Sequence, residues 1–438
     1  MSVDWDRLEF EAVDLLSRYV RVDTSNPPGR ERAACDFLGS VLERENIPFE
    51  LFDAGNDRVS LRAELSGNGT ERPFMLLNHT DVVPAEAEFW TEPPFSGAIK
   101  DGYVWGRGAL DMKGLGIVQL LVLATLKREG VPLARDVVYF AQADEEAGSE
   151  FGMRWIVRNH PETLDAEFVI NEGGGGLTEM FGVTQPVFTV AVGEKSPVWL
   201  QLTTEGQPGH GSLPHEDNSL ERLVRALAQI QEWDSDWVVT PPVATYFQGL
   251  KQGRILKSDV DEQAIRSLAR RDQRVKALLA STISATTASA GIKHNVIPAR
   301  SEATLDCRLR PGVKPEDFIN NLKLVINDSK VQIEQVHVRS SETNSHQTKL
   351  FEVIDEVVRE LVEDAVVVPG ITLGFTDSSE LRNRGQVSYG FSGGLNTPEV
   401  ARTIHGHDER VSIESIRLNL QAIYEVTRKM CAVPEDRS

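Results

Sequence analysis

The chain has 438 residues, 40% of them hydrophobic, and a formal net charge of −20. This length exceeds what one ordinary core supports, so we expect two domains. The acidic balance opposes binding to nucleic acid or to an anionic membrane surface.

The first residues are acidic and amphipathic, and no apolar run reaches the length of a membrane span, so we expect neither a targeting segment nor a membrane anchor. The cysteines are odd in number, widely spaced and without CxxC pairs. They favour a reducing, cytoplasmic setting over a disulfide framework.

Helical and strand patterns alternate in the first part of the chain. Apolar residues recur at helical spacing over residues 8–19 and 31–43 and predict two amphipathic helices joined by a loop at SNPPG. Short apolar runs follow at 74–77, 137–140 and 168–170, separated by helix-length segments such as 116–127. This alternation predicts an α/β fold with a mostly parallel sheet flanked by helices.

From residue 195 the pattern changes to strands, a helix over 218–231, strands over 293–309, a helix after Pro315 and a strand over 331–338. It predicts a smaller α/β domain, residues 195–341, inserted into a domain formed by residues 1–194 and 342–438. We interpret the charged and then Ser/Thr/Ala-rich segment 249–290, with two expected helices, as an elaboration of this insert.

Candidate metal ligands follow the predicted strands. In NHTDVVP, His79 and Asp81 are two residues apart on an extended segment, so their side chains point the same way. His79 could bind a metal while Asp81 accepts the other ring N–H. Asp111 in GRGALDMKG precedes an apolar helix, where it could cap the helix or bridge two cations. Taken alone, each motif also fits an ordinary loop or cap.

Further acidic residues follow two more strands. Glu145 and Glu146 are adjacent in ADEEAGS and could divide metal binding and general-base work between them. Glu172 precedes four glycines; a phosphate loop is disfavoured there because GxGxxG spacing is absent and a carboxylate would repel phosphate. His405 in IHGHDERV would supply a second imidazole, with His407 as the alternative.

Ligands of open α/β sheets bind at the carboxyl ends of the strands, so we expect these side chains to share one pocket. Two unit charges about 4 Å apart repel by about 4 kcal/mol at an effective dielectric near 20, so such a cluster needs cations. Two imidazoles and three carboxylates could serve two metals, with Asp111 shared. Mixed nitrogen and oxygen ligands suit zinc, with cobalt or manganese as possible substitutes.

The motifs NHTDVVP, GRGALDMKG, ADEEAGS, NEGGG and IHGHDERV resemble, in the same order, those of the di-zinc hydrolase family of aminoacylase, carboxypeptidase and succinyl-diaminopimelate desuccinylase. The resemblance spans nearly the whole chain. It implies that His79 and Glu172 hold one Zn²⁺, Glu146 and His405 the other, and Asp111 bridges them.

The same resemblance implies the reaction and the fold. A metal-bridged hydroxide would hydrolyse an amide bond in a peptide or N-acyl amino acid that has a free carboxylate. Glu145 would be the general base, Asp81 would orient His79, and Glu409 matches the acidic residue that follows the final ligand. The fold would be a zinc aminopeptidase-like catalytic domain with an inserted α/β sandwich that serves as lid and dimerisation domain.

Three residues of the insert match substrate-contacting positions of the family. His210 in GQPGHGSLPH resembles the lid histidine that reaches the active site of the neighbouring subunit and stabilises the oxyanion, which implies at least a homodimer. Asn295 in HNVIP and Arg308 in DCRLRP match positions that contact substrate. From the residues alone, His210 could equally cap a turn and Arg308 could be a surface strand residue.

One departure concerns the substrate carboxylate. Many relatives read TDxR where this chain has GFTDSSELR, so Ser379 replaces the arginine that can clamp that carboxylate, and Arg382 or Arg384 could substitute for it. The long segment 249–290 resembles the carboxypeptidase S-like branch, which favours peptides or hydrophobic N-acyl amino acids.

Two other classes of function agree less well with the sequence. A non-catalytic protein that binds a peptide or an amino-acid derivative would normally have lost a ligand or the base, and here all are present. A nucleotide-dependent enzyme is disfavoured because no P-loop or Rossmann fingerprint accompanies the glycines.

Overall fold

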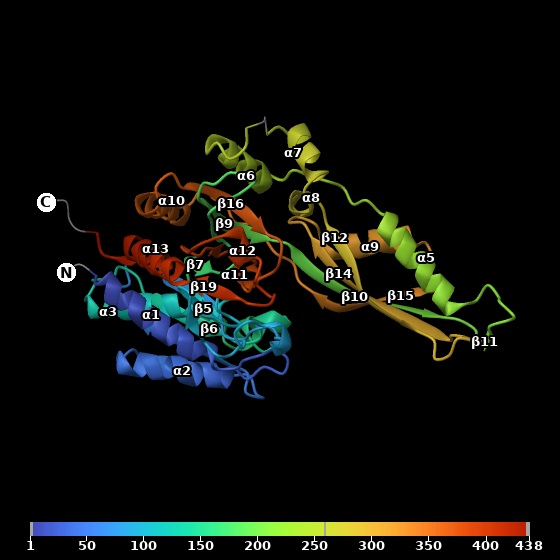
Figure 1. The fold of residues 1–438 in the computed structure, drawn as a ribbon, viewed down its shortest axis with the longest axis horizontal. Helices are drawn as coiled ribbons and strands as arrows, with labels where there is room; N and C mark the ends of the chain where they lie inside the picture. The colour runs from blue at the N-terminus through green and yellow to red at the C-terminus, as the bar shows by residue number, and fades with distance from the viewer. Residues whose placement is uncertain (1–2, 258–259, 435–438) are drawn as a thin grey trace.

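The computed structural model describes residues 3–257 and 260–434. Two sheets of different size lie side by side along the long axis of the molecule, the larger on the left of Figure 1 and the smaller on the right. Within the described ranges, no helix is both long and apolar enough to cross a membrane.

The large sheet is mostly parallel, as the sequence predicts. Its strands follow in the order β1 (Phe49–Asp53), β2 (Val59–Leu65), β6 (Val137–Gln142), β3 (Phe74–His79), β7 (Phe168–Asn171), β17 (Val387–Gly390), β9 (Val187–Glu194), β8 (Gly175–Leu177) and β18 (Leu395–Asn396), with β16 (Val366–Thr372) beside β9. The strand β3 runs parallel to both of its neighbours, β6 and β7. Every residue of these three central strands is buried, which explains their continuous apolar sequence.

Helices cover both faces of this sheet. Phe74 and Leu76 of β3 pack into the larger core, and the alternate residues Met75 and Leu77 pack into a smaller one on the other face. The larger core includes α1 (Trp5–Val20), α2 (Glu31–Arg44), α3 (Lys113–Arg128), α10 (Lys349–Leu361) and α13 (Ile413–Cys431). The smaller core includes α4 (Met153–Asn159) and Leu381 of α11 (Ser378–Arg382).

The smaller sheet is antiparallel and has its own core. Its order is β12 (Thr282–Ala290), β14 (Arg300–Leu309), β10 (Ser196–Glu205) and β15 (Val331–Val338). The helices α5 (Ser219–Glu232) and α9 (Pro315–Ile326) contribute Leu223 and Leu322 to this core, against Leu200 and Leu305 of the strands. At the far right of Figure 1, β11 (Gly209–His210) pairs with β13 (Val296–Ile297).

The segment between the two sheets differs from the interpretation of residues 249–290. The helices α6 (Pro241–Gln252), α7 (Glu262–Ala269) and α8 (Gln273–Leu279) pack on the large core rather than on the smaller sheet. A Cβ at Gly249 would lie 2.6 Å from Cγ1 of Val368, so a glycine is needed for α6 to approach β16. Of the described residues in this segment, only 282–290 join the smaller sheet, as β12, a strand that the sequence pattern did not reveal.

A small third sheet pairs two segments that lie about 300 residues apart in the chain, and its strands are β4 (Ile99–Lys100), β5 (Tyr103–Trp105) and β19 (Arg410–Ser412). The short helix α12 (Pro398–Ala401) precedes the loop that carries His405. Because β19, which follows this loop, pairs with β5, the loop lies beside Asp111 at the edge of the large sheet.

Candidate metal centre

The central strands deliver the predicted ligands to one edge of the large sheet. His79 is the last residue of β3, Glu172 follows β7, and Glu145 and Glu146 lie just after β6. Because β6, β3 and β7 are parallel neighbours, their carboxyl ends meet there. Asp111 lies just before α3 and faces the same edge.

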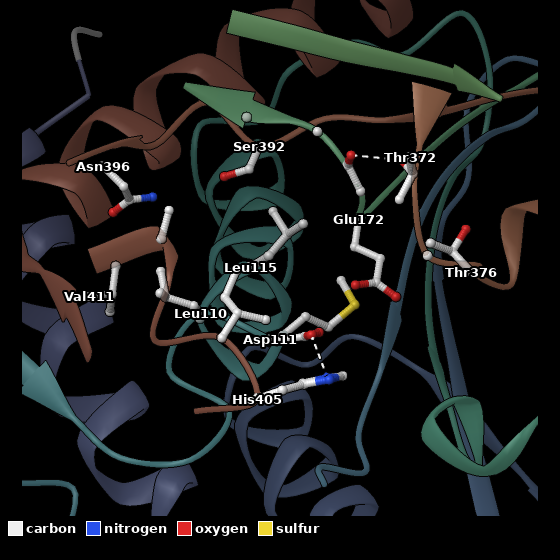
Figure 2. Close-up of a pocket in the computed structure, with 18 of the residues that line it drawn as sticks. Leu110, Asp111, Leu115, Glu172, Thr372, Thr376, Ser392, Asn396, His405 and Val411 are labelled. Atoms are coloured by element: carbon white, nitrogen blue, oxygen red, sulfur yellow. Dashed lines mark hydrogen bonds and ion pairs between the residues drawn. The ribbon is translucent and has the colours of Figure 1, made fainter. Parts of the chain in front are cut away.

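Asp111 stands between the two histidines. Its Oδ1 lies 3.2 Å from Nε2 of His79, and its Oδ2 lies 3.1 Å from Nε2 of His405. Figure 2 shows Asp111 and His405 facing each other below Glu172. Glu172 Oε1 lies 3.5 Å from His79 Nε2, and Glu146 Oε1 lies 3.2 Å from His405 Nε2. The arrangement is two half-sites joined by one carboxylate.

The structure also brings ligand atoms close enough for metal binding. Among the described residues, one group of such atoms within 4.8 Å of one another comes from His79, Asp111 and Glu146, and another from His79, Glu145 and Glu172. Imidazole nitrogen with carboxylate oxygen is a donor set suited to zinc and similar ions.

Asp81 fixes the geometry around His79. The ring Nδ1 of His79 lies 2.9 Å from the Asp81 carbonyl oxygen and 3.5 Å from its carboxylate Oδ1. A carbonyl only accepts, so Nδ1 carries a proton, and Nε2, which faces Asp111, is the ring nitrogen that can bind a metal. The Asp81 carboxylate accepts hydrogen bonds of 3.1 Å from the backbone N–H groups of Glu145 and Glu146.

Burial and like charge disturb the carboxyl groups of the cluster. Burial, with the charge of Asp111, raises the pKa of Glu172 to about 8, and the same causes raise the pKa of Glu146. Burial and the charge of Glu172 raise the pKa of Glu145 well above its usual range. Hydrogen bonds to Asp111 and Glu146 raise the pKa of His405 to about 10. The protein alone therefore holds protons in this cluster, and bound cations would displace them.

A cavity of about 780 Å³ lies beside the ligands. Arg308 and Trp199 line it from the smaller sheet, and Phe375 lines it from the loop after β16. The Arg308 guanidinium lies 5.2 Å from the Phe375 ring centroid, and its Nε donates to Asp306 Oδ1 at 2.8 Å. Arg308 is thus the predicted substrate contact that lies close to the ligands within one chain.

His210 and Asn295 lie elsewhere. His210 is exposed on β11, at the tip of the smaller sheet in Figure 1, and neither residue is among those that line the cavity in the described chain. The N–H of Gly211 donates to the Asn295 carbonyl oxygen at 2.9 Å, so the loops that carry His210 and Asn295 lie next to each other. Their role at a neighbouring subunit stays a prediction.

Arg382 requires a correction. Its guanidinium is buried, forms an ion pair of 2.5 Å with Glu194 and donates to the carbonyl oxygen of Ser388 at 3.1 Å. It does not line the cavity, so the predicted contact of Arg382 with substrate is wrong. Arg384 does not line it either and donates at 3.4 Å to the carbonyl oxygen of Pro161. The hydroxyl of Ser379 is buried and donates to the carbonyl oxygen of Thr376 at 3.0 Å.

His407 is not placed among the ligands. Its ring stacks on Phe89, with centroids 5.2 Å apart, and its Nε2 lies 3.6 Å from Glu86 Oε2. Of the two histidines in IHGHDERV, His405 is the one beside Asp111.

The sequence reasoning missed a supporting network below the cluster. Asn26 donates from Nδ2 to Asp81 Oδ2 at 2.8 Å and to Asp144 Oδ1 at 2.9 Å. Arg58 lies 2.5 Å from Glu31 Oε1 and 3.2 Å from Asp144 Oδ1. Asn26 lies in SNPPG, where the prolines and glycine signal only a loop, and no local pattern links it to Asp81.

The parallel sheet, with histidines and carboxylates gathered at its carboxyl edge, is the framework of a metal-dependent hydrolase. The chain belongs to Peptidase family M20/M25/M40, whose model matches residues 75–429. The family relationship predicted from the motifs is confirmed.

Individual relatives agree with this assignment. The chain is 30% identical over 362 residues to N-fatty-acyl-amino acid synthase/hydrolase PM20D1 of Xenopus tropicalis, which covers 80% of this chain and 70% of that protein. It is 28% identical over 439 residues to aminoacylase-1 of Sus scrofa, which covers 97% of each. Its fold is similar to that of the M20 family metallo-carboxypeptidase Sso-CP2 from Sulfolobus solfataricus, with a TM-score of 0.74 and 18% identity over 97% of this chain and 99% of that one.

Proposed function

We propose that this protein hydrolyses the amide bond of a peptide or an N-acyl amino acid that has a free carboxylate. The observation that carries the proposal is the pair of half-sites joined by Asp111, with a cavity of about 780 Å³ beside them. The names of the relatives support the same reaction class, since one is an N-fatty-acyl-amino acid synthase/hydrolase and another an aminoacylase.

Two Zn²⁺ ions are the proposed cofactors, with Co²⁺ or Mn²⁺ as substitutes. His79 and Glu172 would hold one, Glu146 and His405 the other, and Asp111 would bridge them. Burial and the charge of Asp111 raise the pKa of Glu172 and of Glu146, and a bound cation would stabilise the charged form of both carboxylates. When bound, the metals would lower the pKa of a water molecule and polarise the scissile carbonyl.

Glu145 is the proposed general base and acid. Its side chain is buried beside the ligands, and Oε1 has no hydrogen-bond partner within the described part of the chain. Burial and the neighbouring Glu172 raise its pKa, so it can hold a proton between two steps. It would take a proton from the attacking water and deliver it to the leaving amine nitrogen.

Arg308 is the proposed contact for the substrate carboxylate, because it is the cation that the smaller sheet places in the cavity. We further propose that residues 195–341, inserted between residues 1–194 and 342–438, contain a lid and dimerisation domain, formed by the smaller sheet with α5 and α9. In such a homodimer, His210 and Asn295 would act at the partner's site. Cys35, Cys307 and Cys431 are free and buried, which supports the proposed cytoplasmic setting.

The test is an assay of purified protein with N-acetyl amino acids and dipeptides, before and after chelation and with zinc, cobalt or manganese added back. We expect close to two metal ions per chain by elemental analysis and hydrolysis that chelation abolishes. Full activity without metal would contradict the proposal. Tight binding of these compounds without turnover would favour a non-catalytic binding protein instead.

A further inference from the structure

The cavity continues away from the metal ligands as an apolar arm. Leu115 and Val118 lie one turn apart on α3, and Ile416 on α13 faces the same space. Figure 2 shows Leu110, Leu115 and Val411 on the side of Asp111 that is opposite to Thr372 and Thr376. We define the apolar arm by the following lining residues: Leu110, Leu115, Val118, Leu177, Val411 and Ile416.

The arm carries no charge. The charged residues among the described lining of the cavity are the proposed metal ligands, the proposed base Glu145 and the proposed substrate contact Arg308. None of them belongs to the arm. Leu115, Val118 and Ile416 are each at least 95% buried, so the arm is an internal wall and not an open surface. A charged group would lose its hydration there without a partner, whereas an apolar group gains by leaving water.

The arm ends at a polar partition. Asn396 on β18 and Ser415 on α13 line both this cavity and a second one of about 440 Å³. The Oδ1 atom of Asn396 is buried and accepts no hydrogen bond from the described residues, so no acceptor contact fixes its side chain. Asn396 thus closes the arm with a side chain that is small and not anchored through its oxygen.

The cavity has a cationic side and an apolar side, with the metal ligands between them. Arg308 lies against Phe375, next to Thr376, which Figure 2 places opposite the arm. A substrate whose carboxylate meets Arg308 and whose amide lies beside Glu145 therefore directs its acyl group into the arm.

From these positions we propose that the apolar arm binds the hydrocarbon chain of an N-acyl amino acid and that Asn396 sets the chain length it accepts. The inference rests on the proposed amide hydrolysis and adds the substrate group and the residues that select it. Each methylene that enters the arm should raise kcat/KM by about three- to fourfold until the chain reaches Asn396.

The test uses the metal-loaded protein and N-acylphenylalanines from acetyl through hexanoyl to dodecanoyl and hexadecanoyl, with leucyl-phenylalanine for comparison. We expect kcat/KM to rise along the series, to level off or fall at one length, and to exceed the value for the dipeptide. A flat series, or a preference for the dipeptide over every acyl derivative, would overturn the inference and leave the amide hydrolysis intact. Hydrolysis of none of these compounds would instead refute the proposed function.

Two neighbouring residues on and after β8 provide matched variants. Leu177 lines the arm, while Thr178 lines only the second cavity. Leu177→Trp should fill the arm and lower the ratio of hexanoyl to acetyl turnover at least tenfold, and it should weaken dodecanoate binding measured by calorimetry. Thr178→Trp should change neither ratio nor binding. Equal effects of the two variants on the ratio of hexanoyl to acetyl turnover would contradict the proposed binding of the acyl chain in the apolar arm.

A third variant tests the role of Asn396 through an expected gain, the acceptance of longer acyl chains. Asn396→Ala should join the two cavities and shift the preferred acyl length upward, a result that a damaged fold could not give. Circular dichroism and metal content would be measured on all three variants. An unchanged length preference in Asn396→Ala would remove the role of Asn396.

Discussion

The buried carboxylate of Glu409 accepts a hydrogen bond of 3.0 Å from the backbone N–H of Asp111, 298 residues earlier in the chain. It also accepts from the N–H of Leu110 at 2.8 Å and from Arg107 Nη1 at 2.7 Å. An amide has one accepting oxygen, so Glu409→Gln would turn an NH₂ group toward these donors. We expect metal affinity to fall by about 10- to 100-fold, measured by competition with a chelator.

Glu399→Gln is the matched control. The Glu399 side chain is 76% exposed and pairs with Arg410 at 3.0 Å on the surface. Its replacement should leave metal affinity unchanged. If Glu409→Gln also kept full affinity, the loop before α3 would not depend on this carboxylate.

Glu145→Gln tests the proposed base. The amide keeps the size of the side chain but cannot take a proton from water, so kcat should fall by about 10²- to 10⁴-fold. Metal content should remain that of the wild type, because the proposed ligands are unchanged. Glu150→Gln, on the same loop but exposed, should keep wild-type turnover. Normal turnover of Glu145→Gln would reassign the base.

The central part of the fold was predictable because burial on both faces leaves a pattern within each strand's own sequence. The strands β3, β6 and β7 are buried on both faces, so each is a continuous apolar run that ends in a polar residue. Chain order then placed His79, Glu146 and Glu172 at one edge. The motifs around Asp111 and His405 completed the set, and the structure brings these five side chains together.

The features that were not predicted correctly are set by partners far away in the sequence. Arg382 was predicted to meet substrate, but its charge is matched by Glu194, whose position follows from the pairing of β9 with β16 and β17. The strand β12 was not recognised because it is an edge strand with mostly exposed side chains, which lack the alternation of a half-buried strand. The helices α6 to α8 are amphipathic, but periodicity does not say which core an apolar face will cover.

Arg58→Met tests the network below the metal ligands. Its guanidinium pairs with Glu31 at 2.5 Å and with Asp144 at 3.2 Å, and it donates to Asn26 Oδ1 at 3.0 Å. Removing the cation leaves the buried carboxylates of Glu31 and Asp144 without the positive charge that pairs with both of them. We expect the free energy of unfolding to fall by about 3–5 kcal/mol in urea titration.

The comparison for Arg58 is an exposed ion pair. Arg72 lies 2.8 Å from Asp165, and both side chains are more than half exposed. Arg72→Met should change the free energy of unfolding by no more than about 1 kcal/mol. Similar losses in the two variants would show that burial of the Arg58 network adds nothing.

Lys195 makes a contribution to the free energy of unfolding that depends on pH. Burial, with the nearby Arg308, lowers the pKa of Lys195 to about 7, while an unfolded lysine titrates near its ordinary value of about 10.4. Between these values the unfolded chain binds the extra proton, so the contribution of Lys195 to stability rises with pH. The stability of the wild type relative to Lys195→Met should therefore increase from pH 7 to pH 10, by at most about 1.4 kcal/mol per unit.

Urea midpoints of the two proteins at several pH values would measure this change. Lys330→Met is the control, because the Lys330 side chain is 64% exposed. A wild-type advantage that is constant over this range, or that shrinks as pH rises, would contradict the prediction for Lys195.

His210 is expected to act on the partner subunit. Its Nδ1 accepts a hydrogen bond of 3.2 Å from the N–H of Ser212, so the proton lies on Nε2, which is available to an oxyanion. His210→Ala and Glu145→Gln should each be nearly inactive alone. Mixed in equal amounts, they should recover about a quarter of wild-type activity, because half of the randomly exchanged dimers contain one intact site.

The double variant, with both substitutions in one chain, separates this recovery from nonspecific effects of mixing. Combined with either single variant it cannot assemble an intact site, so its mixtures should stay inactive. Subunit exchange would be followed by native mass spectrometry. Exchange without recovery would place His210 in its own chain's site or outside the reaction, since a histidine acting across the dimer must restore the site wherever an intact Glu145 meets an intact His210.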